Sequence, residues 1–357
     1  MKVALIARST LYTVPGGDTT QIKETAKNLN KLGIETEICL TTNKIKYNNY
    51  DLLHFFNITR PADILYHINK TNKLFVISPN FIDYSEFDKH YRHGIAGWIM
   101  NKLPGNANEY LKTVSRWLLG KDALRSKEYL WRGQKGGIRK ILKKASWLYP
   151  TSEMECVALR KKYRFECGYS VIPNGIDPVI FHANNDILKD DKLVLCAARI
   201  EGLKNQVNLI KALNNTSFTL MIIGEVGPNH SRYYEVCKSI ASKNILFTGK
   251  LSQKELASFY AKAKVHVLPS WFETCGLSSL EAAAMGCNIV ITDKGYTREY
   301  FGDEAFYCDP ADPGSIYQSI KEAAGTDCQK ILHKRIKTTY TWENAAGKIL
   351  EGYNKIL

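Results

Sequence analysis

The amino-acid sequence predicts an α/β protein built from two doubly wound, Rossmann-like domains that face each other across a cleft. With 357 residues the chain exceeds what one hydrophobic core usually serves. Short apolar runs alternate with amphipathic stretches in two successive series, which is typical of parallel sheets covered by helices. A turn-forming segment, Pro173-Asn174-Gly175, lies between the two series.

The first series begins with an apolar strand at residues 2–7 and a helix at residues 18–32. In this helix Ile22, Ala26 and Leu29 fall on one face, and Gly33 supplies a stop signal. The further strands expected in this half are short and apolar, which suits burial on both faces of a parallel sheet. They lie at residues 34–40, 52–56, 74–78 and 147–151.

The second series repeats the alternation. Its expected strands lie at residues 193–198, 218–223, 245–248, 265–268 and 289–292, and its expected helices around Leu209, Val236, Leu256 and Leu280. A closing helix is expected at residues 342–356. We therefore expect an N-terminal domain at 1–168, a second domain at 169–338 and a C-terminal helical segment at 339–357.

Composition indicates a globular protein, since 45% of the residues are hydrophobic and 24% are charged. The nine cysteines lie far apart and form no CxxC pair, so neither a disulfide framework nor a zinc site is expected. The opening run MKVALIA is interpreted as a buried strand and not as a signal peptide, because its apolar part ends at Arg8. No stretch approaches the length of a spanning helix. A cytoplasmic protein is expected, with a peripheral position on the cytoplasmic face of a membrane as a hypothesis.

The positive charge of the chain, +14 in total, is concentrated between Lys89 and Lys144, where fourteen basic residues face three acidic ones. Trp98, Trp117 and Trp131 are interleaved with them. Cations mixed with tryptophan suit an anionic bilayer surface, so residues 85–145 are interpreted as a basic, aromatic insertion that contacts a membrane. The alternative is an insertion with a solvated basic rim. Nucleic acid is not expected as a partner, because no RNP, KH, zinc or helix-turn-helix signature is present.

The strongest local signal is the segment from Ser270 to Gly286, which lies between two predicted strands. It reads as a loop followed by a helix that begins near Gly276, and a glycine-bearing loop before a helix exposes backbone N–H groups that suit a phosphate. Glu273 precedes the helix and Glu281 lies about one turn inside it. Carboxylates accept hydrogen bonds from paired hydroxyls, so a ribose and a sugar ring are natural partners.

Two cations occur upstream, at the end of the strand at 193–198. Arg199 ends the strand and Lys204 follows five positions later. Both can converge at the carboxyl end of the sheet, where α/β proteins bind ligands. A guanidinium and an ammonium together suit a diphosphate leaving group. Gly16 and Gly17, just after the first strand, would let a ligand approach the backbone.

These residues resemble the retaining glycosyltransferases of family 4, which have the GT-B fold. The resemblance rests on Gly16-Gly17, on residues 171–177 with Phe181, on Arg199 with Lys204, on Glu273 with Glu281, and on the closing segment 340–343 before a helix. It covers nearly the whole chain except about residues 85–145. It implies an N-terminal acceptor domain, a C-terminal donor domain and a last helix that crosses back to the first domain.

The resemblance also implies roles for individual residues. Arg199 and Lys204 would hold the donor diphosphate, Glu281 the ribose and Glu273 the hydroxyls of the transferred sugar. The remaining donor-binding residues would be Gly16, Gly17, Leu251, Cys275, Gly276, Leu277 and Ser278. Such enzymes usually need no metal and no cofactor beyond the nucleotide sugar, here of UDP or GDP type, and they retain the anomeric configuration.

One departure concerns the acceptor side. Many relatives carry a histidine after the strand at 74–78, whereas this chain reads Ser78-Pro79-Asn80. Asn80 is the nearest substitute, and His54, at another strand, is the second acceptor-side candidate. A histidine on a strand is more often a packed core residue.

The expected function is sugar transfer from a nucleotide diphosphate sugar to a lipid-linked or glycan acceptor, in the synthesis of a cell-surface polysaccharide or glycolipid. Two alternatives stay open. One is a nucleotide-sugar epimerase of the same architecture, which would turn over donor without acceptor. The other is a non-catalytic, membrane-associated glycan-binding protein.

Overall fold

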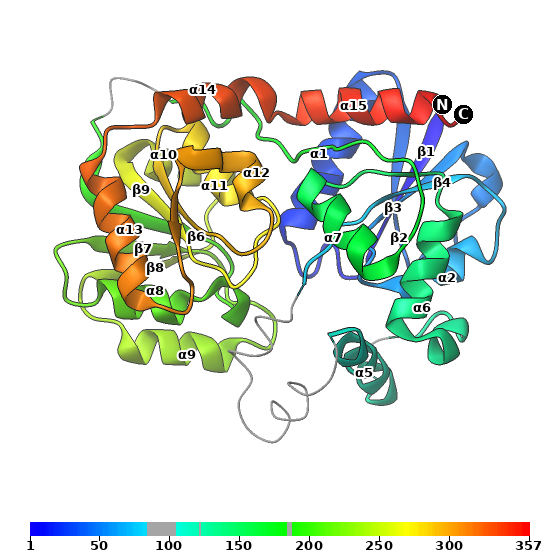
Figure 1. Ribbon diagram of the computed structural model, residues 1–357, viewed down its shortest axis with the longest axis horizontal. Coiled ribbons are helices and arrows are strands. Elements are labelled where there is room, and N and C mark those ends of the chain that lie inside the picture. Colours follow the sequence, from blue (N-terminus) through cyan, green and yellow to red (C-terminus); the bar gives the residue numbers. More distant parts are fainter. Residues whose placement is uncertain (84–104, 121–122, 184–187) are drawn as a thin grey trace. The chain divides into compact units, whose positions relative to one another are not determined.

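The computed structural model of the chain describes residues 1–83, 105–120, 123–183 and 188–357. These residues form two compact units (Figure 1). The N-terminal unit comprises Met1–Pro173 together with Trp342–Leu357, and the C-terminal unit comprises Asn174–Thr341. Each unit contains a parallel sheet with helices around it, so the predicted α/β class with two such sheets is confirmed.

The N-terminal unit has a five-stranded sheet in the order β2-β1-β3-β4-β5. Its strands are β1 (Lys2–Ala7), β2 (Glu35–Leu40), β3 (Leu52–Phe56), β4 (Phe75–Ser78) and β5 (Trp147–Leu148). Its described helices are α1 (Gly17–Lys31), the 3-10 turn η1 (Tyr47–Asn49), α2 (Pro61–Ile68), α5 (Gly105–Leu118), α6 (Glu128–Lys144), α7 (Glu153–Tyr163) and α15 (Trp342–Asn354).

The chain winds outward from β1 in both directions. Right-handed crossovers therefore place α1, between β1 and β2, and α2, between β3 and β4, on opposite faces of the sheet. Helix α15 packs against α1, and α6 packs against α2. The winding direction reverses between β1 and β3, which are adjacent and parallel.

The C-terminal unit has a six-stranded parallel sheet in the order β11-β10-β9-β6-β7-β8. Its strands are β6 (Asp190–Ala197), β7 (Thr219–Ile223), β8 (Ile245–Gly249), β9 (Ala263–Leu268), β10 (Asn288–Thr292) and β11 (Phe306–Cys308). Its helices are η2 (Gly202–Lys204), α8 (Gln206–Leu213), α9 (Ser231–Ile240), α10 (Gln253–Lys262), α11 (Leu277–Ala284), α12 (Thr297–Phe301), η3 (Gly302–Glu304), α13 (Pro313–Gly325) and α14 (Lys330–Thr339). Here the winding reverses between β6 and β9, which are neighbours in the sheet.

Two details of the predicted elements are corrected. The strand expected at 147–151 ends at Leu148, because the next hydrogen bond of the ladder would come from residue 79, and Pro79 has no N–H group. A sixth strand of the second sheet, β11, is not among the expected strands. It has only three residues and pairs with β10 alone, so its sequence carries little periodic signal.

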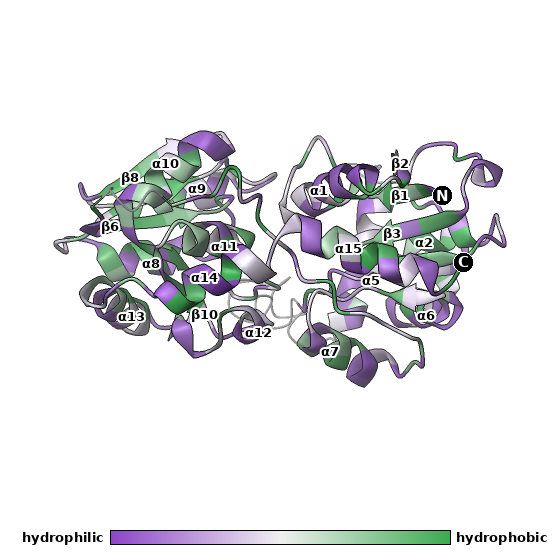
Figure 2. Cartoon of the chain, turned by 90° about the horizontal axis from the view of Figure 1, so that it is seen from above, coloured by the Kyte–Doolittle hydropathy of each residue, from purple (hydrophilic) through white to green (hydrophobic). Residues whose placement is uncertain are grey.

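The core of each unit consists of its strands and the helix faces that cover them. Figure 2 shows the strands largely in the hydrophobic colour, and the outer surfaces of helices such as α1 and α13 largely in the hydrophilic one. Strand β1 is buried from Val3 to Ala7. Among the described residues, no helix is long and apolar enough to cross a membrane, and all nine cysteines are unpaired.

Helix α15 is fixed to the N-terminal sheet by a buried polar contact. The hydroxyl of Tyr353 lies 2.7 Å from Nδ1 of His54 on β3, and both side chains are fully buried. Gly352 allows this close packing, because a Cβ atom there would lie 2.4 Å from the Tyr149 hydroxyl. The last helix is therefore an integral part of the N-terminal unit.

Candidate active site

Two loops meet at the carboxyl edge of the C-terminal sheet, one after β6 and one after β9. The backbone N–H of Trp271 donates to the carbonyl of Leu203 at 2.9 Å. The side-chain amide of Asn205 donates to the carbonyls of Pro269, at 3.0 Å, and Pro310, at 2.7 Å. The winding of the sheet reverses between these two strands, and ligands of open α/β sheets bind at such switch points.

The centre of this region is an ion pair between Lys204 Nζ and Glu273 Oε1. Ser270 Oγ donates to the same carboxylate oxygen at 2.7 Å, and the Ser270 and Glu273 side chains are buried. Burial alone would lower the pKa of Lys204, but the adjacent Glu273 carboxylate outweighs it and raises the pKa above its usual value. The ammonium therefore stays charged at neutral pH, at a side-chain exposure of 20%.

The backbone of Glu273 is held from its other side by the loop after β10. Its N–H donates to the carbonyl of Lys294 at 3.0 Å, and its own carbonyl accepts from the N–H of Tyr296 at 2.9 Å. Gly295 lies between these bonds with φ +112°, and a Cβ atom there would lie 1.9 Å from the Glu273 carbonyl oxygen. This close approach requires glycine.

Arg199 lies two residues after the end of β6, and its side chain is 31% exposed. Its guanidinium forms an ion pair with Glu201 Oε1 at 3.1 Å. The backbone carbonyl of Arg199 accepts a hydrogen bond from the Gln206 side chain at 2.8 Å, which ties the loop to the start of α8. The structure thus places Arg199 on the same loop as Lys204, paired with a different carboxylate.

Helix α11 begins at Leu277, within one residue of the start that the sequence predicted. Gly276 is its N-cap residue and has the left-handed conformation, with φ +64°. Leu277 and Ser278 form the start of the first turn, where backbone N–H groups have no acceptor within the helix. The Cys275 thiol is buried and accepts from the Asn174 side chain at 3.2 Å. Burial raises the pKa of this thiol to about 12, so it is an inert packing group.

Glu281 lies one turn inside α11 and is half-buried. Its carboxylate forms no hydrogen bond or ion pair with any residue in the described part of the chain. Burial raises the pKa of Glu281 to about 8. A half-buried carboxyl group without a protein partner is costly to keep ionised, and hydroxyl groups of a ligand would satisfy it.

The C-terminal unit matches a known protein family. Residues 180–342 fit the model of the family described as glycosyl transferases group 1. The C-terminal unit of the chain is thus similar to the group 1 glycosyltransferases. The matched range contains Arg199, Lys204, Glu273 and Glu281 and spans nearly all of the C-terminal unit.

Among curated proteins, the chain is similar to an uncharacterized 41.2 kDa protein in the cps region of Klebsiella pneumoniae. The two are 21% identical over 266 residues, which cover 66% of this chain and 69% of that protein. The chain is also 22% identical over 210 residues to the O-antigen chain mannosyltransferase B of Escherichia coli, covering 57% of this chain and 50% of that protein. The match therefore spans about half the length of this mannosyltransferase.

Solved structures match over almost the full chain. The sucrose-phosphate synthase from Thermosynechococcus elongatus matches with a TM-score of 0.76 at 16% identity. The match covers 99% of this chain and 98% of the synthase chain. The Anabaena protein Alr3699/HepE, in complex with UDP and glucose, has a TM-score of 0.67 at 15% identity and covers 99% and 100%. The chain thus has the GT-B fold, as the sequence predicted.

The pKa of Glu281 leads to a prediction about stability. Unfolded glutamate ionises near its ordinary pKa of 4.5, whereas folded Glu281 keeps its proton until about pH 8. The folded state therefore binds more protons in this window, and stability falls as pH rises from about 5 to 8. We expect Glu281→Gln to gain stability over the wild type across this range, by at most about 1.4 kcal/mol per pH unit. Urea unfolding at several pH values measures this difference.

The matched control for this experiment is Glu235→Gln on the exposed side of α9. It tests whether loss of a glutamate carboxyl from the protein surface alone produces the same change. A flat difference between Glu281→Gln and the wild type would show that the Glu281 carboxyl does not titrate late in the folded protein.

Leu251 is the one predicted donor residue of the C-terminal unit that lies apart from this group. It follows the edge strand β8, two strands away from β6, and packs partly buried against the hydrophobic core. Strand β7 separates β8 from β6, whose following loop carries Lys204.

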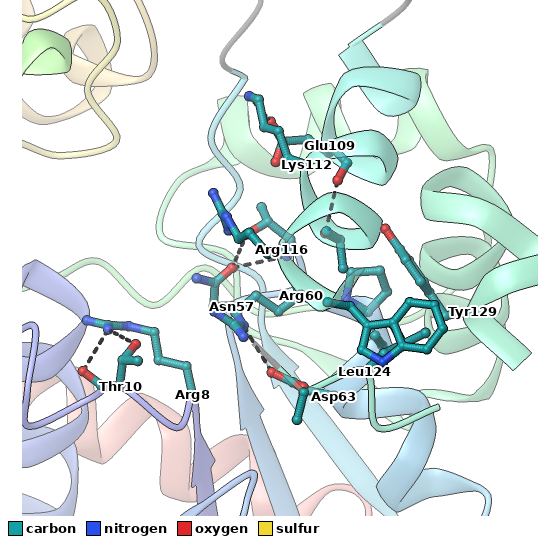
Figure 3. A pocket seen from close by; sticks show the side chains of 16 residues that line it. Arg8, Thr10, Asn57, Arg60, Asp63, Glu109, Lys112, Arg116, Leu124 and Tyr129 are labelled. Atoms are coloured by element: carbon teal, nitrogen blue, oxygen red, sulfur yellow. Dashed lines mark hydrogen bonds and ion pairs between the residues drawn. The ribbon is translucent and has the colours of Figure 1, made fainter. Parts of the chain in front are cut away.

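The N-terminal unit contains a cavity of about 340 Å³ at the carboxyl ends of β1 and β3 (Figure 3). Arg8 and Thr10 line it from the loop after β1, Asn57 to Asp63 from the loop after β3 and the start of α2, and α5 lines it from Glu109 to Trp117. Its position is the point at which the winding of this sheet reverses.

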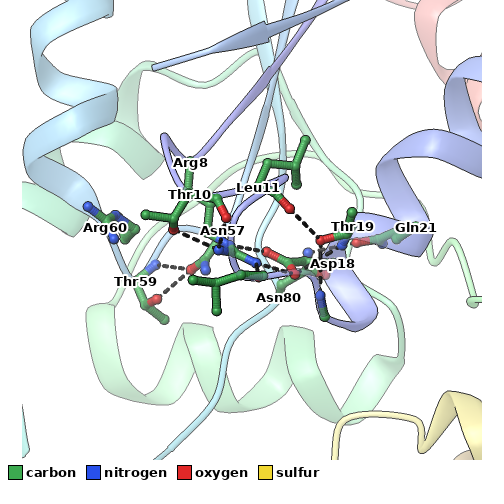
Figure 4. A network of polar contacts seen from close by, with 12 residues as sticks. Arg8, Thr10, Leu11, Asp18, Thr19, Gln21, Asn57, Thr59, Arg60 and Asn80 are labelled. Atoms are coloured by element: carbon green, nitrogen blue, oxygen red, sulfur yellow. Dashed lines mark hydrogen bonds and ion pairs between the residues drawn. The ribbon is translucent and has the colours of Figure 1, made fainter. Parts of the chain in front are cut away.

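Gly16 and Gly17 lie beside this region, at the start of α1. The loop before them is fixed by Arg8, whose guanidinium donates to both carboxylate oxygens of Asp18, at 2.5 and 3.0 Å, and to the carbonyls of Thr10 and Val14 (Figure 4). Gly17 is exposed. The hydrogen bonds of the mostly buried Arg8 side chain therefore fix the loop that leads to the two glycines.

The two acceptor-side candidates differ in their surroundings. Asn80 follows β4, has a positive φ of 47° and donates to the Gln21 side chain at 2.7 Å, so it lies at the same edge of the sheet (Figure 4). His54 is fully buried, with Nδ1 bonded to Tyr353 and Nε2 lying 2.9 Å from Ser78 Oγ. Burial lowers the pKa of His54 to about 3. The structure makes His54 a core residue and leaves Asn80 as the accessible candidate.

Several residues that shape the site were given no role in the sequence analysis. Ser270 could have been found, because it lies two residues after the end of β9 and three residues before Glu273. Arg8 follows β1 in the same way. Gly295 and Asn205 act through contacts with distant segments, and no local pattern marks them. In the described ranges, no three His, Cys, Asp or Glu side chains are arranged to hold a metal ion.

Proposed function

We propose that the chain transfers a sugar from a nucleoside diphosphate sugar of UDP or GDP type to an acceptor, with retention of the anomeric configuration. The donor binds at the carboxyl edge of the C-terminal sheet. The observation that carries this proposal is the Lys204–Glu273–Ser270 cluster beside the N-terminus of α11, with the unsatisfied carboxyl of Glu281 one turn further on.

Each residue has a role that follows from its chemistry. Arg199 and Lys204 stabilise the negative charge that develops on the leaving diphosphate. The N–H groups of Leu277 and Ser278 add hydrogen bonds to phosphate oxygens. Glu281 accepts from the ribose hydroxyls, and Glu273 from the hydroxyls of the transferred sugar. Attack on the same face through an oxocarbenium-like state then needs no enzymic nucleophile.

The donor itself is proposed from the similar proteins. The Anabaena structure contains UDP and glucose, and two of the similar curated proteins are mannosyltransferases of O-antigen and lipopolysaccharide core synthesis. UDP-glucose and GDP-mannose are therefore the first donors to test. The same names support a role in cell-surface polysaccharide synthesis with a lipid-linked or glycan acceptor.

The experiment is a donor panel with and without acceptor. Purified protein is incubated with UDP-, GDP- and ADP-sugars, in the presence and absence of membrane extract, and nucleotide release is measured. Release that depends on the extract supports transfer. Isomerised donor without extract would support an epimerase instead, and no turnover with any donor would contradict the proposal.

We also propose that the basic, aromatic segment attaches the enzyme to the cytoplasmic face of an anionic membrane. In its described part, the large apolar side chains Leu111, Trp117, Leu118, Leu119 and Trp131 are exposed. Exposed cations lie between them at Arg116, Lys127, Arg132, Lys135, Lys143 and Lys144. Four further cations of this prediction, Lys112, Arg125, Arg139 and Lys140, are half-buried. Lys89, Arg92, Ile95, Trp98, Ile99, Lys102 and Lys121 lie outside the described ranges.

This surface predicts binding to acidic liposomes that weakens with salt, because each cation near an anionic bilayer contributes about 1 kcal/mol. Leu118→Ala should reduce liposome binding several-fold, since the Leu118 side chain is 72% exposed and would enter the interface. Val179→Ala, an exposed aliphatic side chain of the C-terminal unit, is the control. Sedimentation with liposomes measures both, and equal binding of the two variants would argue against this surface.

A further inference from the structure

We infer that the cavity of the N-terminal unit binds a phosphate group carried by the acceptor. This inference rests on the proposed function, because it names the chemistry of the acceptor for the same reaction. The cavity is lined by none of the residues that are proposed to bind the donor. The cavity volume of about 340 Å³ lies at the lower end of the range for small-molecule sites.

The charges that line the cavity are mostly cationic. The lining contains four cationic side chains and two carboxylates (Figure 3). The cations are Arg8, Arg60, Lys112 and Arg116, and the carboxylates are those of Asp63 and Glu109. The cavity lining therefore carries an excess of positive charge, which favours an anionic ligand.

Three of these cations already have carboxylate partners. Arg60 pairs with Asp63 at 2.9 Å, Lys112 with Glu109 at 2.7 Å, and Arg8 with Asp18, which lies outside the cavity. Arg116, on the last turn of α5, has no ion pair or hydrogen bond to any described residue. A guanidinium offers five N–H donors in a planar fork that matches phosphate oxygens.

Asn57 adds a second donor. Its φ of +70° places it in the turn after β3, where its side-chain oxygen accepts from the backbone N–H of Thr59 at 3.0 Å and from the Thr59 hydroxyl. The oxygen is thus occupied, and the amide N–H₂ group has no acceptor among the described residues. Arg116 and Asn57 together supply donors without free acceptors, which suits a phosphate better than a neutral sugar, whose hydroxyls need both.

One wall of the cavity is apolar. Trp117, Leu124 and Tyr129 line it, and Leu118 and Leu119, just beyond Trp117, are 72% and 67% exposed. A phosphate in the cavity would therefore have hydrophobic surface beside it. This arrangement fits a prenyl phosphate or diphosphate, and the same donors would also bind the phosphate of a water-soluble sugar phosphate.

The test is calorimetric titration of the full chain with inorganic pyrophosphate. Pyrophosphate can also occupy the donor site, so the titration is made in the Lys204→Gln variant as well. We expect Lys204→Gln to retain a binding event that the additional change Arg116→Gln weakens about tenfold to hundredfold, because one charge-assisted contact is lost. Lys44→Gln, an exposed cation of the loop after β2 that lies outside the cavity, is the control and should leave this event unchanged.

Farnesyl diphosphate distinguishes the two sources of phosphate. Tighter binding of farnesyl diphosphate than of pyrophosphate, with the gain lost in Leu118→Ala/Leu119→Ala, indicates a lipid-linked acceptor. Equal binding of the two probes indicates a soluble phosphate. Unchanged binding in Arg116→Gln, or loss of all binding in Lys204→Gln alone, would overturn the inference. The donor panel is independent of this titration, so failure of sugar transfer and failure of the phosphate site give different results.

Discussion

Replacing Lys204 by alanine is expected to lower kcat by about 10- to 100-fold, and replacing Arg199 as well by about 10² to 10⁴-fold. Each cation would contribute about 1.5–3 kcal/mol to the transition state through a charge-assisted hydrogen bond to the leaving diphosphate. Nucleotide release from the donor identified by the panel measures the rates. Lys211→Ala, an exposed lysine of α8, controls for loss of charge in the same unit.

The Lys204→Ala substitution also removes the ion-pair partner of Glu273. Without the ammonium, Glu273 becomes a buried carboxylate with only the Ser270 hydroxyl on that oxygen, and loss of a buried ion-pair partner costs about 3–5 kcal/mol. The double variant Lys204→Ala/Glu273→Gln should recover much of this stability and none of the rate. If the double variant recovered activity along with stability, Lys204 would be a structural residue with no role in the transition state.

Gly295→Ala is expected to disturb the site through the backbone. The new methyl group would lie 1.9 Å from the Glu273 carbonyl oxygen, and the φ of +112° is unfavourable for alanine. Because the Glu273 backbone is bonded on both sides of this position, the loop that carries Glu273 must move. We expect a loss of about 2–4 kcal/mol in the free energy of unfolding, by overpacking and strain, together with loss of donor binding.

Gly325→Ala is the matched control, because it lies at the end of α13 and a Cβ atom there meets nothing within 4 Å. It should be neutral or stabilising by up to about 1 kcal/mol. Chemical unfolding and a donor thermal-shift assay measure both variants. If Gly295→Ala were as stable as Gly325→Ala and still bound donor, the close approach of the two loops would not exist in solution.

Most of the fold was accessible from the sequence because its strands are short, apolar and parallel. Such strands alternate with amphipathic helices, and the alternation alone identifies the class and most elements. Helix α11 was placed within one residue because Gly276 marks its start. The strand at 147–151 was predicted to be too long. The apolar run continues past Leu148, which forms the last strand pair with Ile77.

The site was accessible only in part. Lys204 and Glu273 lie 69 positions apart in the sequence. They meet because β6 and β9, whose following loops carry them, are neighbouring strands of the sheet. Their direct pairing was not predicted, because it depends on side-chain reach and on Ser270. His54 was proposed from its position on a strand, which does not say whether a side chain faces the core. The cavity around Arg116 could not be predicted, because its walls come from three segments far apart in the sequence.

The assignment of helix α15 to the N-terminal unit has a consequence for biosynthesis. During translation β1 to β5 leave the ribosome long before Tyr353, so the whole C-terminal unit must be synthesised before Nδ1 of His54 can bond to Tyr353. The C-terminal unit, in contrast, is one uninterrupted stretch and can close as soon as it is synthesised. The later half of the polypeptide is thus expected to reach its native state first, and the earlier half to be completed last.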